Sequence, residues 1–119
     1  MPQKILPFFL SPLSRLVLGG SGGPTIISGV LQVILGVVTL GRPLETAVTA
    51  PRIHDQAVPP VLLVEPGVAP EVRGLLERLG HRVVEMPAIG AVAAAGIGAD
   101  GTPAAAGDAR KDGGAAVVR

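Results

Sequence analysis

One stretch near the start of the chain constrains the fold more than any other. Three apolar residues, Leu16 to Leu18, are followed by Gly19-Gly20-Ser21-Gly22-Gly23, then by Pro24 and a long apolar segment. Glycines adopt backbone conformations that are closed to residues with a Cβ atom. Pro24 has a φ angle suited to the first turn of a helix. The pattern therefore predicts a strand, a tight turn and a helix in direct succession.

The segment Thr25–Leu40 is apolar on nearly every helical face. A helix of this kind is buried either in a protein or in a membrane. A membrane-spanning helix needs about 20 apolar residues, and this segment is shorter and has no charged residue at its start. We therefore predict a buried core helix that ends at Gly41. A small membrane-attached protein, held by Phe8, Phe9 and this helix, is a weaker alternative.

The glycine-rich turn is a candidate binding site for a negative charge. Backbone N–H groups just ahead of a helix attract anions. No Gly-Lys-Ser/Thr follows the turn, so it is not a phosphate-binding P-loop, and it does not match the dinucleotide fingerprint. Our hypothesis is that the turn holds an anion, or an oxyanion formed during a reaction. The alternative is that the glycines only make a sharp corner.

The rest of the chain reads as short elements separated by Pro and Gly. Apolar residues at helical spacing predict an amphipathic helix over Pro70–Leu79 with one apolar face. The dipeptide Asp100-Gly101 between two apolar runs predicts a hairpin. The other expected elements are a helix over 43–50, extended segments over 53–56, 61–65 and 81–86, hairpin strands over 91–97 and 103–106, a polar loop over 107–114 and a last strand over 115–118.

Composition limits the possible functions. Only 16% of the 119 residues are charged, against roughly 25% in typical soluble domains, so the chain resembles a piece from the interior of a larger protein. The net charge of +1 and the absence of a basic patch exclude nucleic acid as an expected partner. With no Cys and two His, neither a Cys nucleophile nor a metal cofactor is expected. Residues 1–15 are predicted to be an irregular leader.

The order of segments resembles the C-terminal part of the small subunit of γ-glutamyltransferases (γ-glutamyltranspeptidases). The likeness extends from about residue 16 to residue 118. It rests on the glycine turn before the long helix and on four short motifs in a fixed order: Ala50-Pro51-Arg52-Ile53-His54, Glu65-Pro66-Gly67, Gly80-His81 and Gly113-Gly114-Ala115-Ala116.

This resemblance implies a fold and a reaction. The implied fold class is α/β (α+β), and the implied architecture is a partial Ntn-hydrolase-like αββα sandwich that is incomplete in this chain. Residues 16–119 are expected to be the C-terminal segment of this domain. The implied reaction is γ-glutamyl transfer or hydrolysis by an N-terminal Thr nucleophile, without a cofactor. Two consecutive glycines donate N–H groups to the oxyanion, and the matching residues here are Gly22 and Gly23.

The chain also departs from the family pattern. Nothing before Arg15 resembles the nucleophilic Thr, Ser21 replaces the Pro that usually precedes the two glycines, and residues 10–14 do not match the usual Ser-Ser context. We therefore expect this chain alone to be inactive. The expected partners are a γ-glutamyl small molecule in the complete enzyme and a missing N-terminal part or partner chain.

The remaining polar residues receive structural interpretations. For His54 we predict a structural hydrogen bond, for His81 a surface or capping position, and for Asp108 with Arg110 a loop-stabilising pair. Asp55, Glu65 and Asp112 show no pairing typical of general acid–base catalysis.

Several alternatives stay open at this stage. The chain could be a non-catalytic remnant that pairs with a partner chain, and a complete enzyme could act on glutathione-type substrates or on cephalosporin side chains. The compartment could be periplasmic, extracellular or cytoplasmic.

Overall fold

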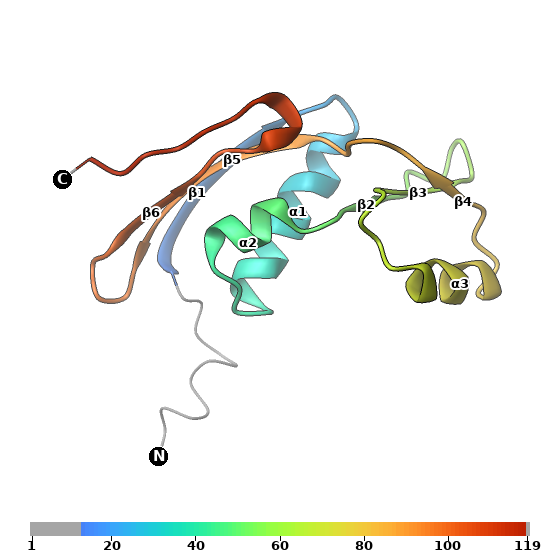
Figure 1. The fold of residues 1–119 in the computed structure, drawn as a ribbon, viewed down its shortest axis with the longest axis horizontal. Coiled ribbons are helices and arrows are strands. Elements are labelled where there is room, and N and C mark those ends of the chain that lie inside the picture. Colours follow the sequence, from blue (N-terminus) through green and yellow to red (C-terminus); the bar gives the residue numbers. More distant parts are fainter. Residues whose placement is uncertain (1–12, 119) are drawn as a thin grey trace, which may run out of the picture.

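The computed structural model describes residues 13–118, which form one flat body with extents of 44 × 37 × 21 Å. Two separate three-stranded sheets run through it. Figure 1 shows the larger sheet with two helices beneath it on one side of the molecule, and the smaller sheet with one helix on the other.

The larger sheet is antiparallel, with the strand order β1-β5-β6. Its strands are β1 (Leu13–Ser21), β5 (Ala91–Gly98) and β6 (Pro103–Ala106). The turn between β5 and β6 contains Asp100 and Gly101, and Gly101 has a φ of +85°. The hairpin predicted from this dipeptide is therefore confirmed.

The main core lies between this sheet and two helices. Helix α1 (Thr25–Val38) and helix α2 (Leu44–Thr49) pack against the same face of the sheet. With few aromatic residues in the chain, the buried side chains are small and aliphatic. They are Val33, Val37, Leu44, Ala47, Val48, Val92, Ala94 and Ala106.

The opposite face of this sheet is also apolar, but it is open. Val17 on β1 is 74% exposed and lies opposite Ala95 of β5. Ala93, Ala95 and Ile97 alternate with the buried residues of β5 and are exposed as well. A sheet that is apolar on both faces belongs in the middle of a layered fold, with a further layer on each side. The described residues supply one of these two layers.

Helix α1 corrects the expectation of a helix buried all round. Its inner face is buried through Gly29, Val33 and Val37, but an apolar stripe on its outer face stays exposed. Ile27, Leu31, Leu35 and Val38 are between 44% and 76% exposed. The physical reason is that the sheet can cover only one side of a helix.

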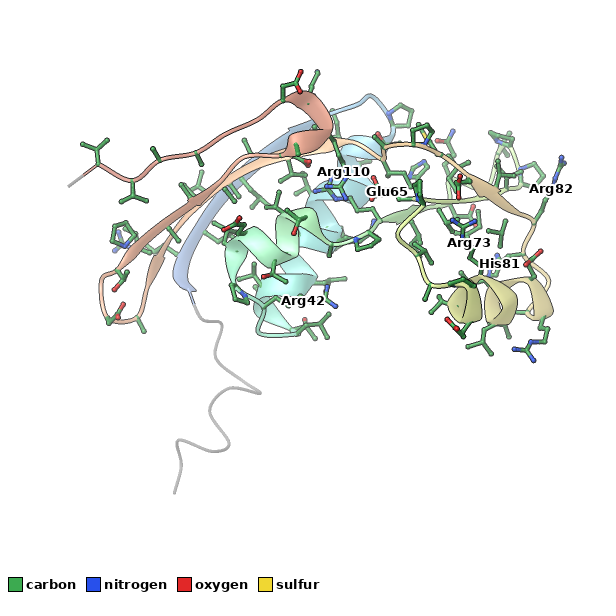
Figure 2. All side chains as sticks on the ribbon, in the orientation of Figure 1. Arg42, Glu65, Arg73, His81, Arg82 and Arg110 are labelled. Atoms are coloured by element: carbon green, nitrogen blue, oxygen red, sulfur yellow. The ribbon has the colours of Figure 1, made fainter. Side chains whose placement is uncertain are left out.

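The smaller sheet combines β2 (Ile53–His54), β3 (Leu62–Val64) and β4 (Val83–Glu85). Helix α3 (Pro70–Arg78) connects β3 to the parallel strand β4, and Arg73 of α3 forms a 2.6 Å ion pair with Glu85. Figure 2 shows Arg73, His81 and Arg82 in this part of the molecule, far from the larger sheet. The amphipathic helix is confirmed, yet Val72, Leu75 and Leu79 on its apolar face are exposed.

Two further predictions differ from the structure. Residues 115–118 form no strand and follow a short 3-10 helix, η3 (Ala109–Lys111), in the polar loop. Strand β1 already begins at Leu13, within the residues assigned to the leader, while residues 1–12 lie outside the described part. No helix in residues 13–118 is long and apolar enough to cross a membrane.

Candidate active site

The glycine turn lies between the end of β1 and the start of α1. Gly22 and Gly23 have φ angles of +127° and +61°, in the region that favours glycine. A Cβ atom on Gly22 would lie 2.6 Å from Thr25 Oγ1 and 2.9 Å from Gly90 Cα. The Thr25 hydroxyl donates a 2.7 Å hydrogen bond to the Gly22 carbonyl. The turn is thus fixed by backbone conformation, by close packing and by one side chain.

The N–H groups of Gly22 and Gly23 have no acceptor among residues 13–118. Both glycines are exposed, and the carbonyls of the same residues accept the amides of Thr25 and Ile26. A hollow of about 210 Å³ lies beside Gly22, with Thr25, Gly90 and Lys111 among its lining residues. This arrangement leaves the two N–H groups free to bind a small anionic group.

A cation lies next to the turn. Lys111 of η3 extends its Nζ to within 3.0 Å of Ser21 Oγ, the side chain directly before Gly22. Lys111 is exposed, and within the described residues it has no carboxylate partner. Sequence reasoning missed Lys111, because nothing local relates residue 111 to residue 21.

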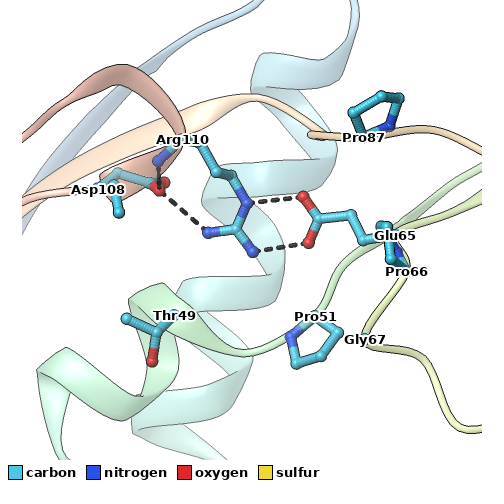
Figure 3. Close-up of a pocket in the computed structure, with 9 residues that line it drawn as sticks. Thr49, Pro51, Glu65, Pro66, Gly67, Pro87, Asp108 and Arg110 are labelled. Carbon is cyan, nitrogen blue, oxygen red and sulfur yellow. Dashed lines mark hydrogen bonds and ion pairs between the residues drawn. The ribbon is translucent and has the colours of Figure 1, made fainter.

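A cluster of four charged residues, three of them buried and Arg110 partly buried, fixes η3 in place: Arg52, Glu65, Asp108 and Arg110. In Figure 3 the Arg110 guanidinium meets the Glu65 carboxylate with two parallel hydrogen bonds, each 2.6 Å long. Arg110 also donates to the carbonyls of Val48 and Ala50 at the end of α2. Carbonyls in the last turn of a helix lack partners within the helix, so the Arg110 guanidinium satisfies the Ala50 carbonyl and gives the Val48 carbonyl a second donor beside Arg52.

Arg52 completes this cluster from the other side. It is 1% exposed and donates to Asp108 at 2.9 Å, to the Val48 carbonyl at 2.8 Å and to the Ile89 carbonyl at 3.1 Å. Asp108 also accepts hydrogen bonds from the Val92 amide and from Arg110. The two arginines and two carboxylates neutralise each other, and this pairing offsets the desolvation free energy of placing charged groups in the interior.

The cluster shifts the pKa values of its members. Burial alone raises the pKa of Glu65, but hydrogen bonds from Arg110 and from the amides of Ile89 and Arg52 outweigh it and lower the pKa overall. Burial likewise raises the pKa of Asp108, and hydrogen bonds from Arg110 and Val92 outweigh it. The hydrogen bonds to Glu65 raise the pKa of Arg110 above its usual value. All of these groups are therefore charged near neutral pH.

The hollow in Figure 3 measures about 300 Å³, and its lining includes Thr49, Pro51, Gly67 and Pro87 together with Glu65, Asp108 and Arg110 of the charged cluster. Its polar groups already have partners within the protein. Residues beyond η3 are held by close backbone packing, since a Cβ atom on Gly113 would lie 2.5 Å from the Asp108 amide nitrogen. The cluster is therefore a support that holds Lys111 beside the turn, and the free groups are at the turn itself.

Known proteins resemble this chain in sequence and in fold. A family model described as gamma-glutamyltranspeptidase matches residues 4–118, almost the whole chain. The chain belongs to the γ-glutamyltranspeptidase family. A curated relative, the glutathione hydrolase proenzyme of Escherichia coli, is 38% identical over 95 residues, which cover 80% of this chain and 16% of that protein. The chain thus spans about a sixth of the length of this relative.

Solved γ-glutamyltranspeptidase structures have the same fold. The acivicin-inhibited γ-glutamyltranspeptidase superimposes with a TM-score of 0.76 at 36% identity, covering 82% of this chain and 54% of the solved chain. A mutant of the Helicobacter pylori γ-glutamyltranspeptidase also gives 0.76 at 34% identity, covering 86% and 62%. The predicted fold class, an incomplete Ntn-hydrolase-like part of mixed helices and strands, is confirmed.

The structure places the other predicted residues of this γ-glutamyltranspeptidase-like chain as follows. His54 is 5% exposed, and its ring is hydrogen-bonded to Ser28 and Gln56, which confirms a structural role. His81 is exposed beyond the end of α3. The predicted pair of Asp108 and Arg110 is present at 3.0 Å.

Sequence reasoning missed the rest of this charged cluster. Arg52 and Glu65 join Asp108 and Arg110 across separations of 56 and 45 residues. The short motifs around Arg52 and Glu65 were the only signal in the sequence.

Proposed function

We propose that this chain is a C-terminal segment of a γ-glutamyltransferase-like enzyme and that it supplies the oxyanion-binding turn. The observation that carries the proposal is the pair of exposed, unpaired N–H groups at Gly22 and Gly23, ahead of the 14-residue helix α1. These groups can donate hydrogen bonds to a carbonyl oxygen that becomes negatively charged under nucleophilic attack. The substrate class is a γ-glutamyl compound of the glutathione type.

The nucleophile comes from outside the described residues. Near the turn, the Thr25 hydroxyl donates to the Gly22 carbonyl, and the Ser21 hydroxyl accepts from Lys111. Neither hydroxyl has a base positioned to remove its proton. In this proposal a Thr on the missing part attacks the γ-glutamyl carbonyl, and the acyl group then passes to water or to an amino acid or peptide. No step requires a metal or an organic cofactor.

The missing part is also the partner of this chain. The open sheet face around Val17, Ala95 and Ile97 and the outer stripe of α1 are apolar and exposed. Exposed apolar side chains that lie next to one another on a sheet face or along a helix are typical of a binding surface. We propose that the remaining layers of the αββα sandwich cover these two surfaces in the complete enzyme.

A chimera tests this proposal. Residues 13–118 replace the corresponding part of the Escherichia coli relative, and activity is measured with a chromogenic γ-glutamyl anilide. The isolated chain should show no turnover above the blank. The chimera should be cleaved from its proenzyme form and should turn over the anilide. A folded but inactive chimera would favour the alternative, a non-catalytic remnant that only binds a partner chain. Turnover by the isolated chain would contradict the proposal directly.

A further inference from the structure

Strand β1 forms a long open edge of the larger sheet. It spans nine residues and pairs with β5 on one side, and within residues 13–118 no strand pairs with its other side. An edge strand presents a row of N–H and C=O groups that can pair with the strand of another chain. The opposite edge, β6, is only four residues long and begins with Pro103, and proline has no N–H to donate to a neighbouring strand. The edge of this sheet that is open to a further strand is therefore β1.

This edge lacks the features that keep edge strands from pairing with other chains. Charged residues, prolines and bulges commonly protect such edges. From Leu16 to Ser21 the strand contains neither a charged residue nor a proline. Its pairing with β5 is regular there, since the one register shift lies before Arg15. Most of the length of β1 can therefore accept a further strand.

The exposed stripe of α1 lies beside the same edge. Helix α1 packs against β1 and β5, whereas α2 packs against β5 and β6. Gly36 faces α2, because a Cβ atom there would lie 3.0 Å from Ala47 Cβ. With about 3.6 residues per turn, the exposed residues Ile27, Leu31 and Val38 lie on the side of α1 that faces away from α2. The stripe and the free edge of β1 thus form one continuous surface.

We propose that two copies of this chain pair antiparallel along the free edge of β1, with Val17 on the two-fold axis. Val17 is the midpoint of the strand, so this register pairs the largest number of residues. It places Arg15 opposite the partner's Gly19, where a Cβ atom would meet nothing within 4 Å, and like charges do not meet. Leu16 lies opposite the partner's Leu18, and both leucines are on the face that packs against the core.

The same pairing brings the two α1 helices together. Paired strands lie about 4.8 Å apart, and α1 contacts both β1 and β5. The two helix axes should therefore lie about 10 Å apart, which is a normal distance for packed helices, with the two exposed stripes facing each other. The dimer does not depend on the proposed function. In a complete enzyme the missing layers would cover the stripe in place of a second copy.

Disulfide cross-linking of the full 119-residue chain tests the register, because the chain contains no cysteine. Val17→Cys places two thiols opposite each other, on Cβ atoms about 5 Å apart. Arg15→Cys is the matched control on the same face of β1, since its two thiols would lie about 13 Å apart along the strands. Under mild oxidation Val17→Cys should form covalent dimers at least about tenfold faster than Arg15→Cys, because a disulfide needs closely spaced Cβ atoms. An equimolar mixture of Arg15→Cys and Gly19→Cys should give the mixed disulfide.

Sedimentation equilibrium of the chain without cysteines provides a second readout. The parent chain should be a dimer. Val17→Lys should be a folded monomer, because like charges directly opposite each other destabilise paired strands and Val17 is exposed in the single chain. Val58→Lys, in an exposed loop, should remain a dimer.

Three results would each overturn the proposal: a monomeric parent chain, a Val17→Lys variant that associates like the parent, or equal cross-linking of Val17→Cys and Arg15→Cys. The second result would point to association through α1 or the open sheet face alone. An inactive chimera would count against the proposed function only, because these experiments need no turnover.

Discussion

At the scale of single residues, Glu65 and Arg110 form an ion pair with two hydrogen bonds of 2.6 Å. Their side chains are only 6% and 13% exposed. Removing one partner of a buried ion pair leaves an uncompensated charge and costs about 3–5 kcal/mol. We expect Arg110→Gln to lower the free energy of unfolding by this amount, measured by urea unfolding at low protein concentration. Arg73→Gln breaks the half-exposed pair with Glu85 and should cost less than about 1 kcal/mol. Equal effects of the two substitutions would contradict this account of the cluster.

The same residues set the acid stability of the chain. The folded-state pKa values of Glu65 and Asp108 lie below their usual values. At moderately acidic pH the unfolded chain therefore binds more protons than the folded chain, so stability decreases as pH falls. The contribution is fully present above about pH 5, since unfolded carboxyls titrate near pH 4, and is lost as pH falls through the folded-state values. Stability measured from neutral to acidic pH should follow this curve. Arg110→Gln raises the folded-state pKa values of both carboxyls toward their unfolded values, so below about pH 5 its stability should fall less steeply than that of the parent. An equally steep fall would disprove the assignment.

Sequence reasoning identified some residues of the site and missed others for one physical reason. The pair of Asp108 and Arg110 is two positions apart, and the Gly22–Gly23 turn is continuous, so local patterns were sufficient for both. Lys111 and Ser21 are 90 positions apart, and Arg110 and Glu65 are 45 apart. Such contacts depend on how the strands and helices are arranged, which local patterns do not determine. The oxyanion role of Gly22 and Gly23 stays a prediction.

At the scale of elements, two helical glycines should respond in opposite ways to the same substitution. A Cβ atom on Gly36 of α1 would lie 3.0 Å from Ala47 Cβ of α2, whereas one on Gly74 of α3 would meet nothing within 4 Å. Gly36→Ala should therefore destabilise the chain by about 1–3 kcal/mol through overpacking. Gly74→Ala should stabilise it by up to about 1 kcal/mol through helix propensity. Urea unfolding of both variants tests this, and two stabilising substitutions would show that α1 and α2 are not closely packed.

Most helices and strands follow from periodicity and from the positions of Pro and Gly. Helix α2, the hairpin of β5 and β6, and α3 were predicted in this way and are confirmed. The covering of α1 could not be predicted, because an apolar pattern shows which faces need burial but not which faces this chain itself can bury. Residues 115–118 have strand-forming composition, yet they have no strand partner in the described structure.

At the scale of the whole molecule, the outer stripe of α1 should make the isolated chain associate. Leu31 and Leu35 are 50% and 44% exposed on this stripe. Leu31→Glu with Leu35→Lys should convert oligomers or aggregates of the isolated chain into monomers, as measured by light scattering, because exposed apolar area drives association. In the chimera the same changes should reduce folding or activity. Val58→Lys is the control, since Val58 is 78% exposed in a loop. An already monomeric parent chain would argue against the stripe as an interface.

The oxyanion role of the turn can be measured only in a complete molecule, through the rate of the first turnover of the active chimera. The substitution Gly23→Pro removes one N–H donor. A proline at this position also cannot adopt the φ of +61° observed for Gly23. Gly23→Ala keeps the donor and has open space for its Cβ, so it reports backbone strain alone. Gly80→Ala makes the same kind of change at another open glycine with positive φ, far from the turn.

We predict that Gly23→Pro slows release of the anilide by about two orders of magnitude or more, equal to roughly 3 kcal/mol for one oxyanion donor. Substrate binding should change much less, because the oxyanion exists only near the transition state. The two alanine variants should stay much closer to the parent rate. If a folded Gly23→Pro chimera releases the anilide within a few-fold of the parent rate, the turn is only a corner between β1 and α1, and the oxyanion assignment is wrong.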